Sequence, residues 1–108
     1  STAAIPSEVV ETMPQYPGGE MAIFKHIFEN IKYPVDAMEK GIQGRVVVNF
    51  IIEKDGSIGN ASVESSLYPS LDAEAIRVIK TLKKFTPGTQ NGKPVAVGYH
   101  LPITFRMQ

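Results

Sequence analysis

The stretch VAVGYHLPITFRM, at residues 95–107, alternates between large apolar side chains and small or polar ones along almost its whole length. Alternation with a period of two indicates a β-strand that buries one face. This strand contains Pro102, which has no N–H to donate to a neighbouring strand, and proline is tolerated mainly in strands at the edge of a sheet. We therefore predict an edge strand over residues 95–106.

The open side of this strand is a candidate binding site. Backbone groups of alternate residues point to the same neighbouring strand, so an open side next to Pro102 exposes the backbone of Ala96, Gly98, His100 and Thr104. An unpaired edge of this kind can accept a strand from a partner. The face predicted to be buried carries Val95, Val97, Tyr99, Leu101, Ile103 and Phe105.

Two further strands are predicted near the middle of the chain. Residues 46–52 alternate strongly, Asp55-Gly56 is a hairpin turn signal, and a weaker alternating segment covers residues 58–64. Because these two strands form a hairpin and a helix then returns the chain along the sheet, the last strand runs antiparallel to the first. The predicted strand order is second, first, last. The buried face of the first strand carries Val46, Val48, Phe50 and Ile52.

Three helices are predicted from apolar residues at helical spacing. They cover residues 19–32, residues 34–40 with Gly41 at the end, and a third segment that begins with Ser70 as its N-cap. The stripe on the first helix is Met21, Phe24, Phe28 and Ile31, with Ile23 and Ile27 beside it, and the stripe on the third is Leu71, Ala75, Val78, Ile79 and Leu82.

The remaining segments are assigned to linkers and loops. Residues 1–17 contain three prolines and indicate a linker or extended lead-in, so the domain is predicted to span residues 18–108. Residues 86–94 are expected to be a loop. The resulting fold class is α+β: a three-stranded antiparallel sheet with two to three helices packed on one face.

Composition excludes several classes of function. The chain has eleven basic and eleven acidic residues, so no charge excess favours nucleic acid or an anionic membrane surface. It has no cysteine, which excludes disulfides and thiol catalysis. His26 and His100 stand alone in their segments, and no nucleotide-binding, metalloprotease or nucleophile motif occurs. We predict no catalytic residue, no metal and no cofactor, and an interaction module rather than an enzyme.

Ser1 is expected to begin a processed or excised fragment, because the chain lacks an initiator methionine and a signal-like start. No apolar run approaches the roughly 20 residues that span a bilayer. A membrane anchor upstream of this chain would not be seen in it.

The order of several short motifs resembles the C-terminal domain of TonB, the energy transducer of Gram-negative bacteria. The matching run is YPVDAMEKGIQGRVVVNFIIEKDGSI, followed by LDAEAIRVIKTLKKFTPG and a final VGYHLPITFRM. The upstream segment PQYPGGEMAIFKHIFENIKYP is similar to the variant common in the Bacteroidetes. The resemblance covers residues 14–107 and implies a three-stranded antiparallel sheet with helices on one face.

The resemblance also implies an architecture and a partner. The whole protein would have one N-terminal transmembrane helix in the inner membrane, a proline-rich spacer and this domain in the periplasm. The helix would work with the ExbB–ExbD proton channel. The domain would bind the TonB box of TonB-dependent outer-membrane receptors by strand addition to its last strand, and pulling would admit a nutrient.

Eight residues are expected to contact the receptor. Backbone pairing gives affinity with little side-chain specificity, so one transducer could serve many receptors. The best-studied members of the family carry a basic residue where this chain has Asp36, so the resemblance does not extend to their electrostatic contact with the receptor plug. The expected contacts are Ala96, Gly98, His100, Thr104 and Arg106 on the last strand, with Asn30, Tyr33 and Pro34 from the segment before the hairpin.

Two alternatives stay open at the level of sequence. Similar domains occur at the C-terminus of membrane-bound sensor peptidases, where they would sense or bind rather than pull. The chain could also be a homodimerisation module, through pairing of its edge strand or through the face that carries Val47 and Ile51.

Overall fold

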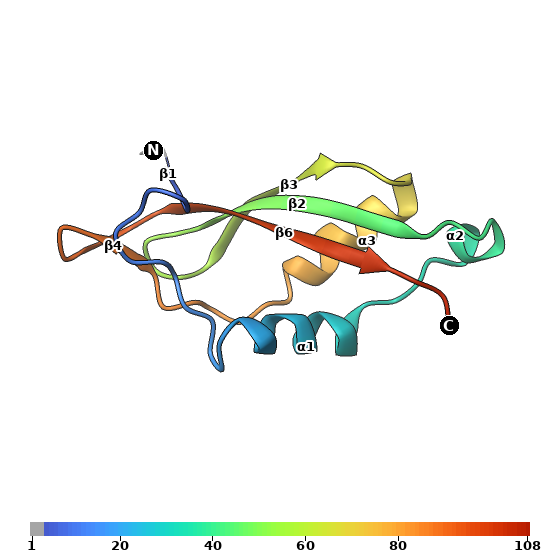
Figure 1. Ribbon diagram of the computed structural model, residues 1–108, viewed down its shortest axis with the longest axis horizontal. Coiled ribbons are helices and arrows are strands. Elements are labelled where there is room, and N and C mark those ends of the chain that lie inside the picture. The colour runs from blue at the N-terminus through green and yellow to red at the C-terminus, as the bar shows by residue number, and fades with distance from the viewer. Residues whose placement is uncertain (1–3) are drawn as a thin grey trace.

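A mixed sheet with helices packed on it confirms the predicted α+β class (Figure 1). The structure is a computed structural model that describes residues 4–108, so the expectation about Ser1 lies outside the described residues. Within them, no helix combines the length and the apolar composition that crossing a membrane requires. The elements in chain order are β1 (Ile5–Pro6), α1 (Glu20–Asn30), α2 (Val35–Glu39), β2 (Gly44–Ile52), β3 (Ile58–Ser65), α3 (Pro69–Ile79), β4 (Gly88–Gln90), β5 (Lys93–Val95) and β6 (Val97–Phe105).

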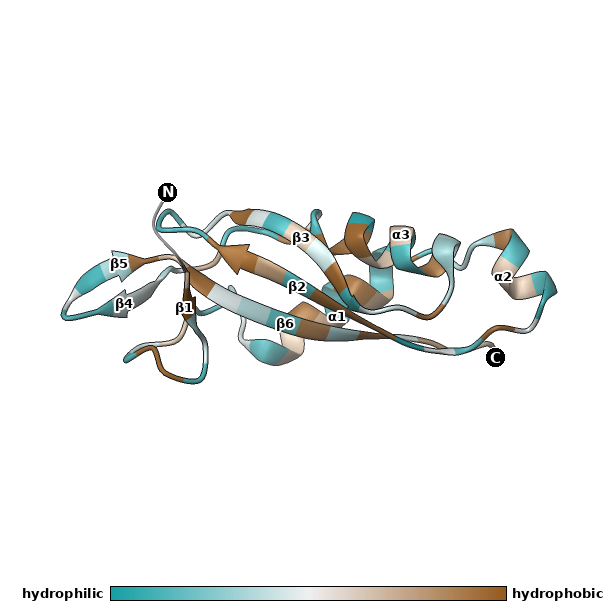
Figure 2. Cartoon of the chain, turned by 90° about the horizontal axis from the view of Figure 1, so that it is seen from above, coloured by the Kyte–Doolittle hydropathy of each residue, from teal (hydrophilic) through white to brown (hydrophobic). Residues whose placement is uncertain are grey.

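The strands of the main sheet follow the order β3-β2-β6-β1. β2 pairs antiparallel with β3 on one side and with β6 on the other, where the register runs from Gly44–Phe105 to Ile52–Val97. The predicted order of second, first and last strand is therefore confirmed. The sheet has one strand more than predicted, because β1 pairs parallel with the start of β6. Figure 2 shows from above that β1 lies at this end of β6.

The core lies between the sheet and the helices α1 and α3. Alternating side chains of β2 and β6 point into it, as the sequence pattern predicts. α3 packs on the inner side of the sheet against β2 and β3 (Figure 1). Each fully buried aliphatic side chain contributes about 1.5–3 kcal/mol to this layer. The strand residues that are buried are Val46, Val48, Phe50, Ile52, Val97, Leu101, Ile103 and Phe105.

The turn between β2 and β3 depends on Gly56, which adopts a φ of 88°. A Cβ at this position would lie 1.8 Å from the carbonyl oxygen of Phe85. The backbone amide of Phe85 donates to the Gly56 carbonyl at 2.8 Å. Hydrogen bonds from the Ser57 hydroxyl and amide hold the pKa of Asp55 below its ordinary value. The turn is thereby fastened to the segment that follows α3.

The expected loop over residues 86–94 is wrong, because β4 and β5 form a small antiparallel hairpin there. Its turn is Asn91-Gly92, with φ angles of 52° and 75°, a dipeptide typical of two-residue hairpins. Val95 pairs with Gly88 in this hairpin. The edge strand predicted from residue 95 therefore begins at Val97.

Residues 4–17 pack along the domain rather than away from it. Thr12 and Thr89 exchange backbone hydrogen bonds at 3.1 and 3.0 Å, and Gln15 and Thr86 do so at 3.0 and 2.8 Å. The ring of Tyr16 is buried, packs edge-on against Phe85 and accepts a hydrogen bond from the Lys83 amide at 3.1 Å. These contacts cross the predicted boundary at residue 17, and the division of the chain there stays a prediction.

Three of the four residues in the apolar stripe predicted on the first helix are exposed, while Ile31 packs partly buried against the core. Ile23 and Ile27, beside the stripe, face the core. Met21 and Phe28 are 78% and 75% exposed, and Phe24 is also exposed. The helix carries two apolar stripes side by side, so periodicity alone does not select the buried one. Ile23 and Ile27 are the residues of α1 that belong to the buried core cluster.

The ends of the other two helices differ slightly from the predictions. Pro34 is the N-cap of α2 rather than its first residue. The N-cap of α3 is Tyr68 and Pro69 opens the helix, so the assignment of Ser70 as the cap is wrong. The Ser70 hydroxyl instead donates to a carboxylate oxygen of Asp36 at 2.6 Å. The predicted stripe of α3 is confirmed, since Leu71, Ala75, Val78, Ile79 and Leu82 are all buried.

Candidate functional site: the open edge of strand β6

β6 is paired along its whole length on one side and only at its start on the other. On the open side, β1 meets it at Val97 and Gly98 alone. Among residues 4–108, no further segment pairs with β6 on that side beyond Gly98. The stretch from His100 to Phe105 is therefore a true sheet edge, and edges of this kind are rarely left bare without protection or use.

Two hydrogen bonds establish which backbone groups face the open side. The amide of Ile5 donates to the carbonyl of Ala96 at 2.9 Å, and the amide of Ser7 donates to the carbonyl of Gly98 at 3.1 Å. Because alternate residues of a strand point to the same neighbour, the backbone of His100, and with it that of residues 102 and 104, also points to this side.

Pro102 agrees with this geometry. It lies opposite Val47 in the register with β2, and its nitrogen lies on the open side, where the pairing with β2 needs no donor. The proline removes one donor from the open edge and leaves its carbonyl available as an acceptor. The remaining open groups are the N–H and C=O of His100 and Thr104, and proline between them interrupts the ladder that a second strand would form.

The inner side chains of β6 hold this strand firmly in the core. Tyr99 stacks at a tilt on Phe50 and on Phe85, with ring centroids 5.4 and 5.9 Å apart. Burial, followed by the negative charge of Glu20, raises the pKa of Tyr99, so the phenol stays neutral at physiological pH. The edge is thus presented by a rigid strand.

His100 lies between two carboxylates on the outer face of the sheet. Its Nε2 is 3.6 Å from a carboxylate oxygen of Glu8, and its Nδ1 is 3.5 Å from one of Glu64. About half of the imidazole is exposed. In the described part of the chain, no three His, Asp or Glu side chains are gathered as a metal ion would require. The site therefore combines an open backbone edge with a small charged cluster.

A second group of expected contact residues meets at the far end of β6. Tyr33, Thr104 and Arg106 line a groove of about 460 Å³ together with Phe28 of α1 and Ile31, the C-cap of that helix. Arg106 follows the last residue of the strand. The groove places an apolar helix surface beside the last open positions of the edge.

Tyr33 and Pro34 have structural roles of their own. The Tyr33 hydroxyl donates to the carbonyl of Ile42, and its ring packs edge-on against Phe105. Pro34 is the N-cap of α2. Tyr33 also lines the groove at the end of β6, and the expected receptor contacts of both residues stay predictions.

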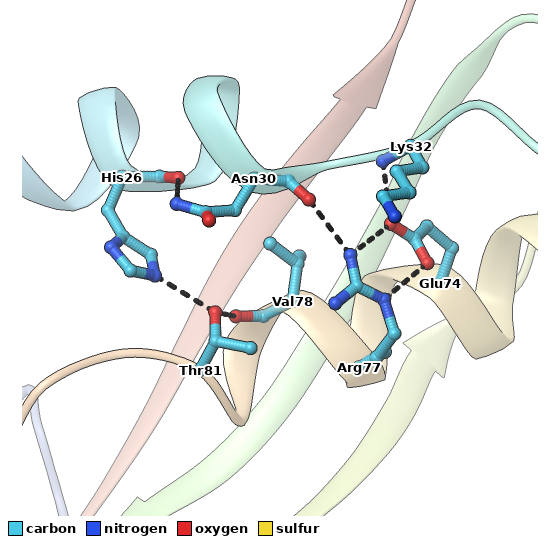
Figure 3. A network of polar contacts seen from close by, with 7 residues as sticks. All are labelled: His26, Asn30, Lys32, Glu74, Arg77, Val78 and Thr81. Atoms are coloured by element: carbon cyan, nitrogen blue, oxygen red, sulfur yellow. Dashed lines mark hydrogen bonds and ion pairs between the residues drawn. The ribbon is translucent and has the colours of Figure 1, made fainter.

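Asn30 belongs to a polar network that joins α1 to α3 (Figure 3). Its side-chain amide donates to the His26 carbonyl at 2.7 Å, and its own carbonyl accepts from Arg77 at 2.8 Å. Arg77 also forms a two-pronged ion pair with Glu74, at 2.7 Å for each bond. The structure does not bring Asn30 together with the expected contact residues on β6.

The pKa of Glu74 reflects this network. Burial of the carboxylate acts to raise the pKa, but the hydrogen bonds from the Arg77 side chain and the Lys32 amide, with the charges of both residues, outweigh it. The net pKa of Glu74 lies below its ordinary value. The ionised carboxylate is therefore part of what fixes the end of α1 against α3.

Sequence reasoning missed two parts of this site. Phe28, which the sequence places in the apolar stripe of the first helix and not among the contact residues, lines the groove beside the edge. Glu8 carries no local signal, because its position next to His100 depends on the path of the whole lead-in segment. The one sequence signal for this surface is that the first helix carries two apolar stripes side by side.

Comparison with known proteins identifies the family. A family model of the Gram-negative bacterial TonB protein C-terminal matches residues 29–107. Protein TonB of Vibrio cholerae serotype O1 is 35% identical over 78 residues, which cover 71% of this chain and 32% of that protein. Protein TonB of Xanthomonas campestris pv. campestris strain B100 is 34% identical over 77 residues, covering 70% of this chain and 34% of that protein. The chain spans about a third of the length of these relatives.

Solved structures show the same fold. An NMR structure of Helicobacter pylori TonB-CTD superposes with a TM-score of 0.63 at 27% identity, covering 82% of this chain and 79% of that one. A second structure of Helicobacter pylori TonB-CTD gives a TM-score of 0.60 at 29% identity, covering 80% and 90%. The prediction that the chain is not an enzyme is confirmed by the family that these matches establish. The chain belongs to the family of C-terminal domains of Gram-negative bacterial TonB proteins.

Proposed function

We propose that the open edge of β6 binds the TonB box of a TonB-dependent outer-membrane receptor as an added strand. The observation that carries this proposal is that most of one side of β6 has an unpaired backbone. Its start already holds a strand through the 2.9 and 3.1 Å hydrogen bonds to Ala96 and Gly98. Beyond Gly98, no strand within residues 4–108 pairs with the side of β6 that faces away from β2. A receptor segment would pair with the same side of β6.

The two surfaces beside the edge would receive the side chains of the added strand. Successive residues of a strand point to opposite faces, so one set would face the groove lined by Phe28 and Ile31. The other set would face His100 and the outer surface of the sheet. We assign receptor contact to the backbone of Ala96, Gly98, His100 and Thr104, with the Arg106 side chain at the end of the strand.

Strand addition suits a protein that transmits force. Several ladder hydrogen bonds share a load that is applied along the strands, and they depend on backbone groups rather than on side-chain identity. β6 passes this load to β2 over the whole register from Val97 to Phe105. The resulting attachment is strong along the strand and tolerant of different receptor sequences.

The remaining steps belong to parts of the protein outside this chain. We place the domain in the periplasm, joined through an upstream membrane anchor to ExbB–ExbD, whose proton flow would supply the pull that admits a nutrient. This assignment rests on the family, since the chain corresponds to about a third of its relatives' length.

An amide NMR titration with a synthetic TonB-box peptide tests the proposal. A control peptide with proline at alternate positions has the same length but lacks half of the backbone donors. We expect shifts and new exchange protection at His100 and Thr104 with the first peptide only. Unchanged exchange at these amides, at millimolar peptide, would overturn the proposed site.

Two other functions would give different results in the same samples. Protection of the β6 amides that rises with protein concentration alone would indicate a homodimer that pairs through its edge, and sedimentation would confirm it. A domain that binds no TonB box and stays monomeric would fit the sensory role instead. The sequence upstream of the domain would then show several membrane helices and a peptidase motif.

A further inference from the structure

We propose that the lead-in segment of residues 5–8 is an intramolecular competitor for the receptor site. This inference rests on the proposed function. The segment occupies the first positions of the open edge, and a receptor strand that pairs with the whole edge must displace it. The domain would therefore exist in a closed form, with β1 on β6, and an open form that binds along the full strand.

The competition follows from the hydrogen bonds of the closed form. The carbonyls of Ala96 and Gly98 accept from the amides of Ile5 and Ser7. These carbonyls are among the acceptors that the proposed function assigns to the receptor. Two strands cannot lie in the same place on one edge, so binding of the receptor at Ala96 and Gly98 requires release of β1.

A side-chain contact also joins the segment to β6. The carboxylate of Glu8 is 3.6 Å from Nε2 of His100, a residue on the open stretch of β6. Together with Ala4 and Pro6, Glu8 walls a groove of about 470 Å³ on the outer face of the sheet. A receptor strand that pairs as far as His100 would therefore have to displace the Glu8 side chain as well as the backbone of the segment.

The closed form is held weakly enough to open. β1 has two residues, and one of them is Pro6, which lacks a backbone donor. The side chains of Glu8 and His100 are 65% and 51% exposed, and ion pairs between exposed groups contribute little to stability. Val9, directly after the segment, is 65% exposed and holds nothing in the core.

The next part of the chain is held much more firmly. Thr12 and Gln15 each exchange two backbone hydrogen bonds with the segment around β4, and Tyr16 is buried in the core. The amide of Glu11 donates to the side chain of Gln90 at 2.9 Å. Opening would therefore be confined to the residues before position 10, while residues 11–17 stay in place.

Substitution of Ser7 tests the competition with the full chain. Ser7→Pro removes the N–H that donates to Gly98, and the position tolerates proline because Ser7 is the second residue of the turn closed by the bond from Val9 N–H to the Pro6 carbonyl. Ser7→Ala is the matched control, since it loses the same hydroxyl but keeps the N–H. A chain that begins at Val10 provides a second variant without the segment.

The readout is the affinity for the synthetic TonB-box peptide, measured by NMR titration. We expect Ser7→Pro and the chain from Val10 to bind about three- to tenfold more tightly than the wild type and Ser7→Ala, because the competent form no longer has to be selected. In the wild type, resonances of Ile5 and Ser7 should shift to unpaired values as peptide binds.

The outcomes separate this inference from the proposed function. Equal affinity in all four proteins, with Ile5 and Ser7 still paired in the complex, would overturn the competition and leave receptor binding intact. Absence of peptide binding to β6 in every protein, including the chain from Val10, would overturn the proposed function and the competition together.

Discussion

The ring of Tyr33 packs edge-on against the ring of Phe105, with centroids 5.7 Å apart and planes at 81°. This contact joins the segment before α2 to the last residue of β6. The Tyr33 hydroxyl adds a hydrogen bond to the carbonyl of Ile42. The pair positions the end of the open edge relative to α1, and it gives Tyr33 a structural reason for its place in the motif.

Tyr33→Phe should therefore weaken folding without weakening receptor binding. The variant keeps the ring contact with Phe105 and loses only the hydroxyl, so we expect a loss of about 1 kcal/mol in the free energy of unfolding. Urea denaturation measures this loss. Tyr33→Leu is the companion variant, and it should lose the aromatic pair as well, worth about 0.5–1.5 kcal/mol more. A tenfold loss of peptide affinity in the stable Tyr33→Phe protein would instead assign the hydroxyl to the receptor interface.

The ion pair of Glu74 and Arg77 should make stability depend on pH. The pKa of Glu74 is lower in the folded chain than its ordinary value, so the unfolded chain binds more protons in the pH range between the two values. The stabilisation is present above the unfolded pKa of about 4.3. It is lost as the pH falls through the folded pKa.

Glu74→Gln tests this dependence. At pH 7 we expect the variant to be less stable by about 1 kcal/mol, because Arg77 is almost half exposed and solvent screens the pair. The difference should disappear at acid pH, where the wild-type carboxyl is protonated. Glu39→Gln, at an exposed position, is the control for general charge effects. A difference that stays constant between pH 7 and pH 3 would show that charge is not the cause.

Gly56 offers the sharpest test of the turn between β2 and β3. Its φ of 88° is unfavourable for any other residue, and a Cβ would lie 1.8 Å from the Phe85 carbonyl oxygen. Gly56→Ala should cost more than about 2 kcal/mol of stability, since backbone and not a flexible side chain must move. Gly92→Ala is the matched control, because Gly92 has a φ of 75° with no atom within 4 Å of the added Cβ. It should cost only about 1 kcal/mol, from backbone strain alone, and equal losses would contradict the collision.

The elements that the sequence predicts well are those whose signal is local and unambiguous. The alternation at Val46, Val48, Phe50 and Ile52 permits one buried face, and the edge position of β6 follows from the missing N–H of Pro102. On α1, by contrast, Met21, Phe24 and Phe28 compete with Ile23 and Ile27 for the core. Only the packing of α1 on α3 decides which stripe is buried, and this packing has no local signature.

The candidate site divides in the same way. Strand geometry predicts which backbone N–H and C=O groups face the open side once the direction of one hydrogen bond is known. These are the groups of Ala96, Gly98, His100 and Thr104. The pairing of β1 with Ala96 and Gly98 could not be predicted from the sequence. It joins residues about ninety positions apart through a two-residue strand that contains a proline. The hairpin at Asn91-Gly92 was predictable from its turn signal, and the prolines around it concealed it.

The last prediction concerns the open edge itself. Thr104→Pro removes a backbone donor on the open side, while Leu101→Pro removes one that the antiparallel pairing with β2 uses. Thr104→Pro should leave the domain folded, with a loss of about 1 kcal/mol or less in the free energy of unfolding. It should weaken TonB-box binding at least tenfold, because Pro102, two residues earlier on the same side of the strand, already lacks a donor. Leu101→Pro should cost about 3 kcal/mol or more of stability.

Thr104→Val keeps the N–H and controls for loss of the hydroxyl. Circular dichroism with urea denaturation checks the folding of each variant, and NMR titration measures its peptide affinity. If Thr104→Pro binds the peptide as well as Thr104→Val does, the far end of β6 takes no part in receptor pairing, and the added strand would have to be held at residues 96–100 alone. Binding would then depend entirely on displacement of β1, and Ser7→Pro would have a larger effect than any substitution at the end of the strand.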